Sequence, residues 1–274
     1  MKTETTFKQS SQSFLEATCL TQQYPGLTAG FTTRNGGYSQ APYTSFNLGL
    51  HVSDSASDVI ANRQKLADEL AYPLASWVVG DQVHASVIKK VTKEHQGSGT
   101  ESLQTAIAAT DGLYTTEADL LLTSLYADCV PLFFVAPNHQ TIGLAHAGWK
   151  GTVGQIGPAM VTRWQNDEGI NPHDIHVLIG PAISGEAYEV NDVVVEAVNQ
   201  CLHQHDERPY IAQANGRFLL DLKKLNKQLL VRSGVPEEQI YVSSICTASD
   251  ERMFSHRADN GQTGRMMSVI GQRI

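Results

Sequence analysis

Residues 125–151, LYADCVPLFFVAPNHQTIGLAHAGWKG, contain two apolar runs separated by a short polar turn. Both runs are nearly continuous in hydrophobic residues, which is typical of strands that are covered on both faces of a sheet. Polar and reactive side chains nevertheless stand at their ends: Asp128 and Cys129 precede the first run, and His146 closes the second just before a glycine turn. We therefore expect a functional site where these two strands end.

The rest of the chain alternates irregularly between strand and helix patterns. Runs rich in Val, Ile, Leu and Tyr predict strands over 76–91, 118–129, 131–137, 141–148, 174–180, 217–222 and 239–246. Apolar residues that recur every three or four positions predict helices over 57–71, 152–165, 191–204 and 221–234. Ser57 is expected to cap the first helix, and Gly234 to end the last. Glycine-rich segments predict loops over 32–43, 95–104 and 257–264.

Composition indicates a globular protein that folds alone. The 274 residues are 41% hydrophobic and 18% charged, and they show neither an internal repeat nor a linker between zones of different composition. We expect a single domain over 1–274. Twenty basic against 28 acidic residues give a net charge of −8, without a basic cluster that could neutralise phosphates. Nucleic acid and anionic membrane surfaces are therefore excluded as expected partners.

The sequence predicts a cytoplasmic protein. Its start is polar and lacks the apolar core of a secretory signal. The most apolar stretch, 120–135, is interrupted by Asp128 and Pro131 and is too short for a membrane helix. The cysteines are far apart and give no support for a disulfide framework. They are Cys19, Cys129, Cys201 and Cys246.

Three residues at strand ends have the side chains of a zinc site. Cys129 and His146 flank the apolar runs, and His84 follows the turn-like GDQV segment. Two imidazoles and a thiolate suit zinc, and three protein ligands leave a fourth position open. The alternative is a cysteine packed in the core and histidines held by hydrogen bonds. The charge of Asp128 and the small residues around His146 favour the metal site.

The motifs TTRNGGYS, DQVH, ADCVP, HAGWKG, GPAISGEAYEV and SHRADNGQTGR occur in the order found in the laccase-domain family. The sequence resembles this family from TTRNGGYS to the C-terminus. Its members were first described as multicopper polyphenol oxidases and later recognised as purine nucleoside phosphorylases. The resemblance implies an α+β fold, a single-domain four-layer α/β/β/α sandwich with mixed sheets. It also implies a catalytic zinc, with copper as the alternative, held by the residues that match here as His84, Cys129 and His146.

The resemblance further implies phosphorolysis of adenosine, inosine, guanosine and methylthioadenosine, and deamination of adenosine. The partners are then small molecules, purine nucleosides and phosphate, and the chain is expected as a monomer or homodimer. Deamination needs a hydroxide at purine C6, which zinc chemistry can supply at neutral pH. His84, Cys129, His146 and Asp128 are the candidate catalytic residues. Asp128 can move a proton, or it can hold a histidine or a backbone amide in place.

Phosphorolysis needs an anion pocket, which an acidic protein must build locally. Arg34 precedes two glycines whose backbone N–H groups can face a phosphate, and the alternative is a solvated loop arginine. Lys150, and Arg257 with its neighbour His256, are further cationic candidates, with surface salt bridges as the alternative. Asn47 can bind a ribose hydroxyl or close a turn. Tyr188 and Trp149 can stack on a purine or pack in the core, and Cys246 is interpreted as a core residue.

Two other functions fit parts of the sequence. A copper oxidase acting on phenols would need several coppers and many histidines in HxH spacing, whereas this chain has only HQH at 203–205. A cysteine hydrolase in peptidoglycan precursor editing would use Cys129 as nucleophile, with His84 or His146 as its base. Related bacterial proteins are linked to that editing.

Overall fold

The computed structural model describes residues 6–273. Its strands are β1 (Lys8–Gln9), β2 (Phe14–Glu16), β3 (Leu27–Thr32), β4 (Trp77–Val79), β5 (Ile88–Lys90), β6 (Gly112–Thr115), β7 (Leu121–Tyr126), β8 (Val130–Ala136), β9 (Thr141–Ala147), β10 (His176–Ile179), β11 (Glu189–Val190), β12 (Tyr210–Ala212), β13 (Phe218–Leu220), β14 (Ile240–Val242) and β15 (Met266–Gln272). Its α-helices are α1 (Thr18–Thr21), α2 (Ala56–Leu70), α3 (Trp149–Val153), α4 (Ile156–Glu168), α5 (Asp192–Gln200) and α6 (Leu222–Arg232).

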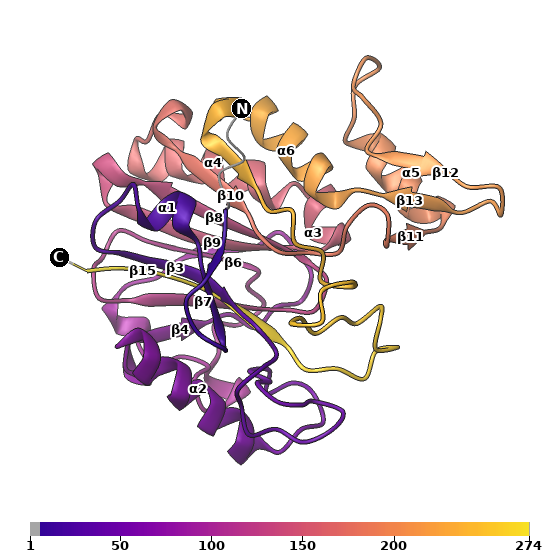
Figure 1. The fold of residues 1–274 in the computed structure, drawn as a ribbon. Helices are drawn as coiled ribbons and strands as arrows, with labels where there is room; N and C mark the ends of the chain where they lie inside the picture. Colours follow the sequence, from indigo (N-terminus) through magenta and orange to yellow (C-terminus); the bar gives the residue numbers. More distant parts are fainter. Residues whose placement is uncertain (1–5, 274) are drawn as a thin grey trace.

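Two six-stranded sheets form the centre of the molecule (Figure 1). One has the strand order β1-β2-β3-β15-β7-β4, and the other has the order β14-β10-β8-β9-β6-β5. Each sheet combines antiparallel pairs with parallel ones, which are β4 with β7, β5 with β6, and β10 with β14. A small third sheet, β11-β13-β12, lies beside α5. The prediction of an α+β fold with mixed sheets is confirmed.

Three apolar clusters hold these elements together. Between the two large sheets, Phe31 and Phe133 belong to one buried cluster, and β7 and β15 contact β9. On the outer face of the β8–β9 sheet, Trp164 of α4 packs in a second cluster that also includes residues of α6. On the outer face of the other sheet, Leu66 of α2 packs against Trp77 in a third cluster. Strands covered on both faces explain the continuous apolar runs in the sequence.

The β8–β9 hairpin brings two of the candidate residues to one end of the second sheet. Every residue of both strands is buried, and Pro131 pairs with His146 across the antiparallel ladder. Cys129 directly precedes β8, so it lies beside the end of β9 that carries His146. The apolar sequence of the hairpin therefore fixes where a thiol and an imidazole meet.

The structure divides the strand expected over 76–91 into β4 and β5. The loop between them begins at Gly80, where a Cβ would lie 2.5 Å from the Thr110 carbonyl oxygen. Asp111 holds the next part of the loop, because its carboxylate accepts backbone N–H groups from 83–85. The strand pattern is interrupted by contacts with a segment distant in sequence.

Other boundaries also differ from the predictions. Ser55, rather than Ser57, caps α2, and its Oγ accepts the Asp58 N–H at 3.4 Å. The helix expected over 152–165 is divided between α3 and α4, since Gln155 adopts a left-handed conformation with φ of 57°. Strand β15 was not predicted, although it lies in the middle of the first sheet. Within residues 6–273, none of the helices combines the length and apolar character that a membrane span requires.

Candidate metal centre and cavity

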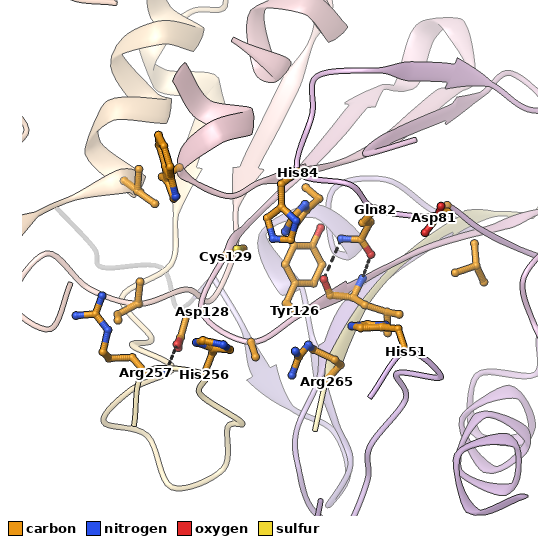
Figure 2. A pocket seen from close by; sticks show the side chains of 18 of the residues that line it. His51, Asp81, Gln82, His84, Tyr126, Asp128, Cys129, His256, Arg257 and Arg265 are labelled. Atoms are coloured by element: carbon orange, nitrogen blue, oxygen red, sulfur yellow. Dashed lines mark hydrogen bonds between the residues drawn. The ribbon is translucent and has the colours of Figure 1, made fainter. Parts of the chain in front are cut away.

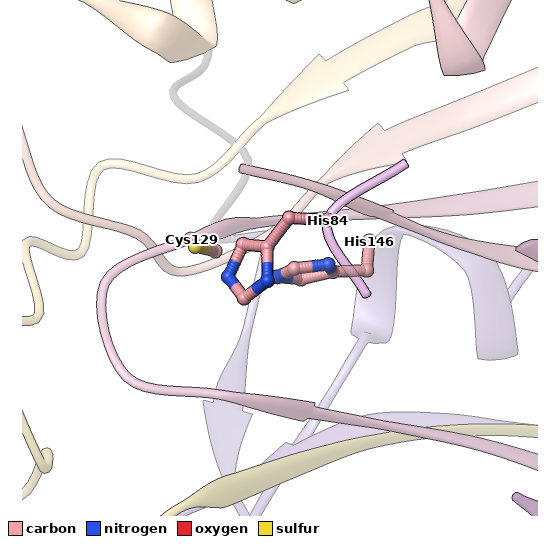
Figure 3. A group of neighbouring side chains, drawn as sticks. All are labelled: His84, Cys129 and His146. Atoms are coloured by element: carbon pink, nitrogen blue, oxygen red, sulfur yellow. The ribbon is translucent and has the colours of Figure 1, made fainter. Parts of the chain in front are cut away.

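His84, Cys129 and His146 meet at the end of the β8–β9 hairpin (Figure 3). Each offers one ligand atom, and these atoms all lie within 4.8 Å of one another. The two imidazole rings have their centroids 4.8 Å apart and are nearly perpendicular, with an interplanar angle of 81°. His84 comes from the β4–β5 loop and has a φ of 60°, so a left-handed backbone turns its side chain toward the hairpin.

Asp111, just before β6, holds both histidines in place. Its Oδ1 accepts a hydrogen bond from His146 Nδ1 at 2.9 Å, which leaves Nε2 of that ring available as a ligand atom. The carboxylate also accepts the backbone N–H groups of the loop that carries His84, at 2.9 to 3.2 Å. Burial raises the pKa of Asp111, but the hydrogen bonds from His146 and the amides outweigh it and lower that pKa. Asp111 was not among the residues predicted from the sequence.

The charges of the cluster suit a divalent metal ion. Burial raises the pKa of Cys129, but the charge of His146 and hydrogen bonds from both histidines outweigh burial and lower the pKa to about 6. Burial lowers the pKa of His146, but the Cys129 thiolate and Asp111 raise it to about 9. A thiolate and two imidazoles, one oriented by a buried carboxylate, form a donor set that fits zinc.

The cluster opens into a cavity of about 550 Å³, which Figure 2 shows from close by. This volume is in the range of small-molecule sites. Besides the three cluster residues, the cavity is lined by His51, Val79, Gly80, Asp81, Gln82, Leu103, Leu125, Tyr126, Ala127, Asp128, Trp149, Ile183, Tyr188, Leu222, His256, Arg257 and Arg265. Aromatic faces, aliphatic groups and two arginines around a metal-type cluster are suited to a flat polar ring with an anionic co-substrate.

Residues 28–273 match the family described as multi-copper polyphenol oxidoreductase laccase. The chain belongs to this laccase-domain family. It is 47% identical over 268 residues to purine nucleoside phosphorylase YlmD of Geobacillus stearothermophilus, covering 97% of each chain. It is 50% identical over 248 residues to purine nucleoside phosphorylase YlmD of Bacillus subtilis, covering 90% of this chain and 89% of the relative. The crystal structure of the Geobacillus protein superposes with a TM-score of 0.96 at 46% identity, covering 99% of this chain and 100% of that one. The resemblance on the sequence motifs is thus confirmed.

Asp128 of this laccase-domain chain faces hydrogen-bond donors. Its backbone is left-handed, with φ of 87°, and its carboxylate is buried. The two oxygens accept hydrogen bonds from Thr247 Oγ1 at 2.7 Å, Ser255 Oγ at 3.0 Å and the Arg257 N–H at 2.7 Å. Of the two roles considered for Asp128, these contacts favour holding a backbone amide, because the carboxylate connects two loops to the start of β8.

Arg257 is the predicted substrate-binding residue that lines the laccase-domain cavity. Its Nη2 donates to the Glu189 carbonyl oxygen at 3.0 Å, and its guanidinium lies 5.2 Å from the centre of the Tyr188 ring. Tyr188 and Trp149 also line the cavity, as stacking on a purine would require. Cys246 is partly buried, and its sulfur accepts the Ser184 N–H at 3.3 Å.

Arg34, Asn47 and Lys150 are not among the described residues that line the cavity. Arg34 donates to the carbonyl oxygens of Thr44 at 3.2 Å and Met253 at 3.4 Å, and so it stabilises its own loop region. Phosphate binding by Arg34 stays a prediction. Lys150 lies 5.7 Å from the Trp149 ring centre, and Asn47 is fully buried.

Two further lining residues, His51 and Arg265, were not predicted from the sequence. Arg265 directly follows the predicted loop over 257–264, and His51 follows the Asn47 turn. They come from distant parts of the sequence, and Arg265 reaches the segment of His51 through a long-range hydrogen bond, in which Asn47 Oδ1 accepts the Arg265 N–H at 2.8 Å. An arginine at the end of a glycine-rich loop was the only local signal for this pair.

Proposed function

We propose that the protein is a zinc-dependent purine nucleoside phosphorylase of broad specificity that also deaminates adenosine. The substrates are adenosine, inosine, guanosine and S-methyl-5′-thioadenosine. The observation that carries the proposal is the His84–Cys129–His146 cluster on the wall of a cavity of about 550 Å³. The names of the relatives, purine nucleoside phosphorylases at 47% and 50% identity, support the reaction class.

His84, Cys129 and His146 would hold the zinc, and the buried Asp111 would fix the second imidazole. When bound, zinc would supply Lewis-acid chemistry, which polarises an oxygen or lowers the pKa of water. The chain's own contribution is to place the nucleoside against that cluster. Tyr188 and Trp149 line the same cavity, and their aromatic rings suit stacking on a purine.

Phosphorolysis joins a phosphate oxygen to ribose C1′ while the bond from C1′ to purine N9 breaks. The bond electrons go to the purine, which takes up a proton, and the products are a free base and ribose 1-phosphate. The cavity must therefore hold an anion beside the sugar. Arg257, whose guanidinium lies over the Tyr188 ring, is a lining residue that can contribute positive charge on the side where a stacked base would lie.

Adenosine deamination replaces the C6 amino group by oxygen from water and releases ammonia, and it uses no phosphate. The two reactions thus share the nucleoside and differ in the co-substrate. A residue that serves only the anion should affect phosphorolysis alone, whereas a residue of the cluster should affect both. This difference makes the two activities internal controls for each other.

The first experiment measures the metal content of the purified protein and both activities, in wild type and in Cys129→Ala. We expect about one zinc per chain in the wild type, phosphate-dependent release of hypoxanthine from inosine, and conversion of adenosine to inosine. Cys129→Ala should lose both reactions and keep its circular dichroism spectrum. Undiminished phosphorolysis in the folded Cys129→Ala variant would contradict the proposal.

A cysteine hydrolase is the second candidate, and one specific observation favours it. Cys129, His146 and Asp111 form a thiol–imidazole–carboxylate series, with the thiol pKa lowered to about 6. This arrangement also suits a nucleophile with an oriented base, which peptidoglycan precursor editing would use. Alkylation of Cys129 in protein that contains zinc separates this candidate from a zinc enzyme.

Copper polyphenol oxidation has less support from the geometry. A multicopper centre needs several groups of histidines, whereas His84, Cys129 and His146 form the one such group found in residues 6–273. The predicted HQH pair, His203 and His205, is not part of that group. Stoichiometric copper together with phenol oxidation in the purified protein would favour this alternative over zinc.

A further inference from the structure

Arg265 lies between two cavities. The cavity of the metal-type cluster has a neighbour of about 680 Å³, lined by residues of 40–43, 51–58 and 261–265. In the described part of the chain, His51 and Arg265 are the two residues that line both cavities. Figure 2 shows the Arg265 side chain among the labelled residues that surround the first cavity, on the same side of the view as His51. A ligand in the first cavity can therefore reach this guanidinium.

Arg265 forms no direct ion pair with a carboxylate among the described residues, although the charges of Cys129 and Asp128 act on it from a distance. Its Nη1 donates to the carbonyl oxygens of Thr263 at 2.9 Å and Gly264 at 3.1 Å. Among the described residues, Nε and Nη2 have no acceptor and no ion pair forms. By contrast, Arg252 pairs with Asp250 at 2.7 Å, and Arg34 lies 3.8 Å from Asp259.

The two donors of Arg265 without acceptors lie on one edge of the guanidinium. Nε–H and Nη2–H point in parallel and form the fork that binds two oxygens of a tetrahedral anion. Arg265 is half-buried, and none of the carboxylates that line the two cavities, Asp54, Asp58, Asp81 and Asp128, accepts a hydrogen bond from this edge. The missing partner is therefore expected to be a ligand.

Backbone hydrogen bonds and the missing side chain of Gly49 hold Arg265 in this position. The backbone N–H of Arg265 donates to Asn47 Oδ1 at 2.8 Å, and the carbonyl oxygen of Arg265 accepts the Leu48 N–H at 3.0 Å. Gly49 gives the side chain room, since a Cβ there would lie 2.7 Å from Arg265 Cγ and 3.3 Å from His51 Cε1. The buried Asn47 thus orients Arg265, and Gly49 allows both side chains to approach the cavity.

His51 can add a neutral donor beside this edge. Burial, together with the charges of Arg265 and Arg63, lowers the pKa of His51 to about 4. An uncharged imidazole still donates one hydrogen bond. Of the carboxylates lining the first cavity, Asp128 is occupied by three donors, and Asp81 forms no ion pair with either arginine among the described residues.

We propose that Arg265 and His51 form an oxyanion subsite that binds inorganic phosphate at the boundary of the two cavities. The inference rests on the proposed phosphorolysis, for which it supplies the site of the second substrate. Arg257 also lines the first cavity, but its guanidinium lies against the Tyr188 ring and apart from Arg265 in Figure 2, so its charge is added on the side of the stacked base rather than at this subsite. The subsite differs from the phosphate position expected at Arg34.

The first test measures binding of inorganic phosphate to the intact protein by calorimetry. Arg265→Met keeps much of the side-chain volume and removes the fork, so phosphate should bind about 10- to 100-fold more weakly. Arg265→Lys should recover only part of the affinity, because a lysine offers no bidentate edge. The control, Arg252→Met, removes an arginine that is paired with Asp250 and lies outside the cavity lining, and it should bind phosphate like the wild type. Wild-type affinity in folded Arg265→Met overturns the subsite.

The second test separates the subsite from the proposed function. If the wild type performs phosphorolysis, Arg265→Met should raise the KM for phosphate about 10-fold or more and leave adenosine deamination within about 2-fold. An unchanged KM for phosphate overturns the subsite while phosphorolysis stands. If the wild type lacks phosphorolysis but loses phosphate binding in Arg265→Met, the subsite stands and the proposed function fails.

A third arm identifies the source of the phosphate group. Inorganic phosphate should bind together with inosine, and adenosine 5′-monophosphate should bind no more tightly than adenosine. Tighter binding of the nucleotide, lost in Arg265→Met, would assign the subsite to a 5′-phosphate and overturn the assignment to inorganic phosphate.

Discussion

Asp111 and His146 form a buried carboxylate–imidazole pair, with 2.9 Å between Oδ1 and Nδ1. Both residues are almost inaccessible to solvent, with 3% and 2% exposure. The same carboxylate accepts the backbone N–H of His84 at 3.0 Å. One buried acid therefore sets the tautomer of one candidate zinc ligand and the loop conformation that delivers another.

Asp111→Asn should weaken zinc binding about 10- to 100-fold, the usual cost of losing a carboxylate behind a metal-bound histidine. The amide NH2 group would face either the His146 ring or the loop N–H groups, all of which are donors. Competition with a chromogenic chelator measures the affinity. Asp174→Asn is the matched control, because Asp174 pairs with His139 at 3.4 Å on the surface. Equal affinities in the two variants would contradict the role given to Asp111.

The sequence predicts the hairpin and the two candidate ligand residues at its ends because both signals are local. Continuous apolar runs mark β8 and β9, and residues of unusual type at their ends mark Cys129 and His146. Strand β15 was not predicted because it follows a loop-like segment near the C-terminus. Its place between β3 and β7 depends on pairings with residues more than 100 positions away in the sequence. Local patterns do not contain such pairings.

The residues that support the site were likewise not predicted, because their contacts are long-range. Asp111 precedes β6 much as Asp128 precedes β8, so an acid before a buried strand was a signal that could have found it. Arg265 and Asn47 come from opposite ends of the chain, and their hydrogen bond is visible only in the fold. The sequence indicates which residues can react, whereas the fold decides which of them face one cavity.

Asp128→Asn tests whether this carboxylate holds loops or carries a proton. The amide would replace an acceptor that now serves Thr247, Ser255 and the Arg257 N–H, so we expect a loss of about 1–3 kcal/mol in the free energy of unfolding. Urea denaturation measures this loss. Asp167→Asn, at an exposed pair with Arg163, should cost less than about 1 kcal/mol.

A role in holding loops also predicts a pattern in the kinetics. Asp128→Asn should raise KM for the nucleoside more than it lowers kcat, and zinc content should stay at the wild-type level. A proton carrier would instead lower kcat in both reactions and remove one limb of the pH profile. That second pattern, in a variant of unchanged stability, would reverse the assignment.

Gly148→Ala should disturb the metal cluster. A Cβ at this position would lie 3.0 Å from Cys129 Sγ and 3.3 Å from His84 Cδ2, so the ligands must move by a few tenths of an ångström. We expect lower zinc affinity with an intact fold, measured by chelator competition and thermal unfolding. Gly154→Ala is equally crowded, at 3.0 Å from the Lys150 carbonyl oxygen, but its Cβ would face no ligand. Wild-type zinc affinity in Gly148→Ala would show that the cluster tolerates the methyl group.

The reactivity of Cys129 distinguishes a zinc ligand from a nucleophile. In zinc-loaded protein, a ligand thiolate should react slowly with iodoacetamide, and removal of the metal should accelerate the reaction. The rate in metal-free protein should rise with pH through about 6 and then level off, because the pKa of Cys129 is lowered to about that value and the thiolate is the reacting form. Mass spectrometry of the labelled peptides gives the rate at each cysteine.

The other cysteines provide the scale for this measurement. Burial raises the pKa of Cys201, so its labelling should stay slow up to alkaline pH in both forms of the protein. For Cys246, burial raises the pKa but hydrogen bonds from Ser184 and Ser249 outweigh it and lower the pKa, so its labelling should not depend on zinc. Fast labelling of Cys129 in zinc-loaded protein, with activity falling in step, would reject the ligand assignment and favour the cysteine hydrolase. Slow labelling that accelerates only on removal of zinc would explain why Asp128 and Cys129 interrupt an apolar run: that strand begins at a metal site.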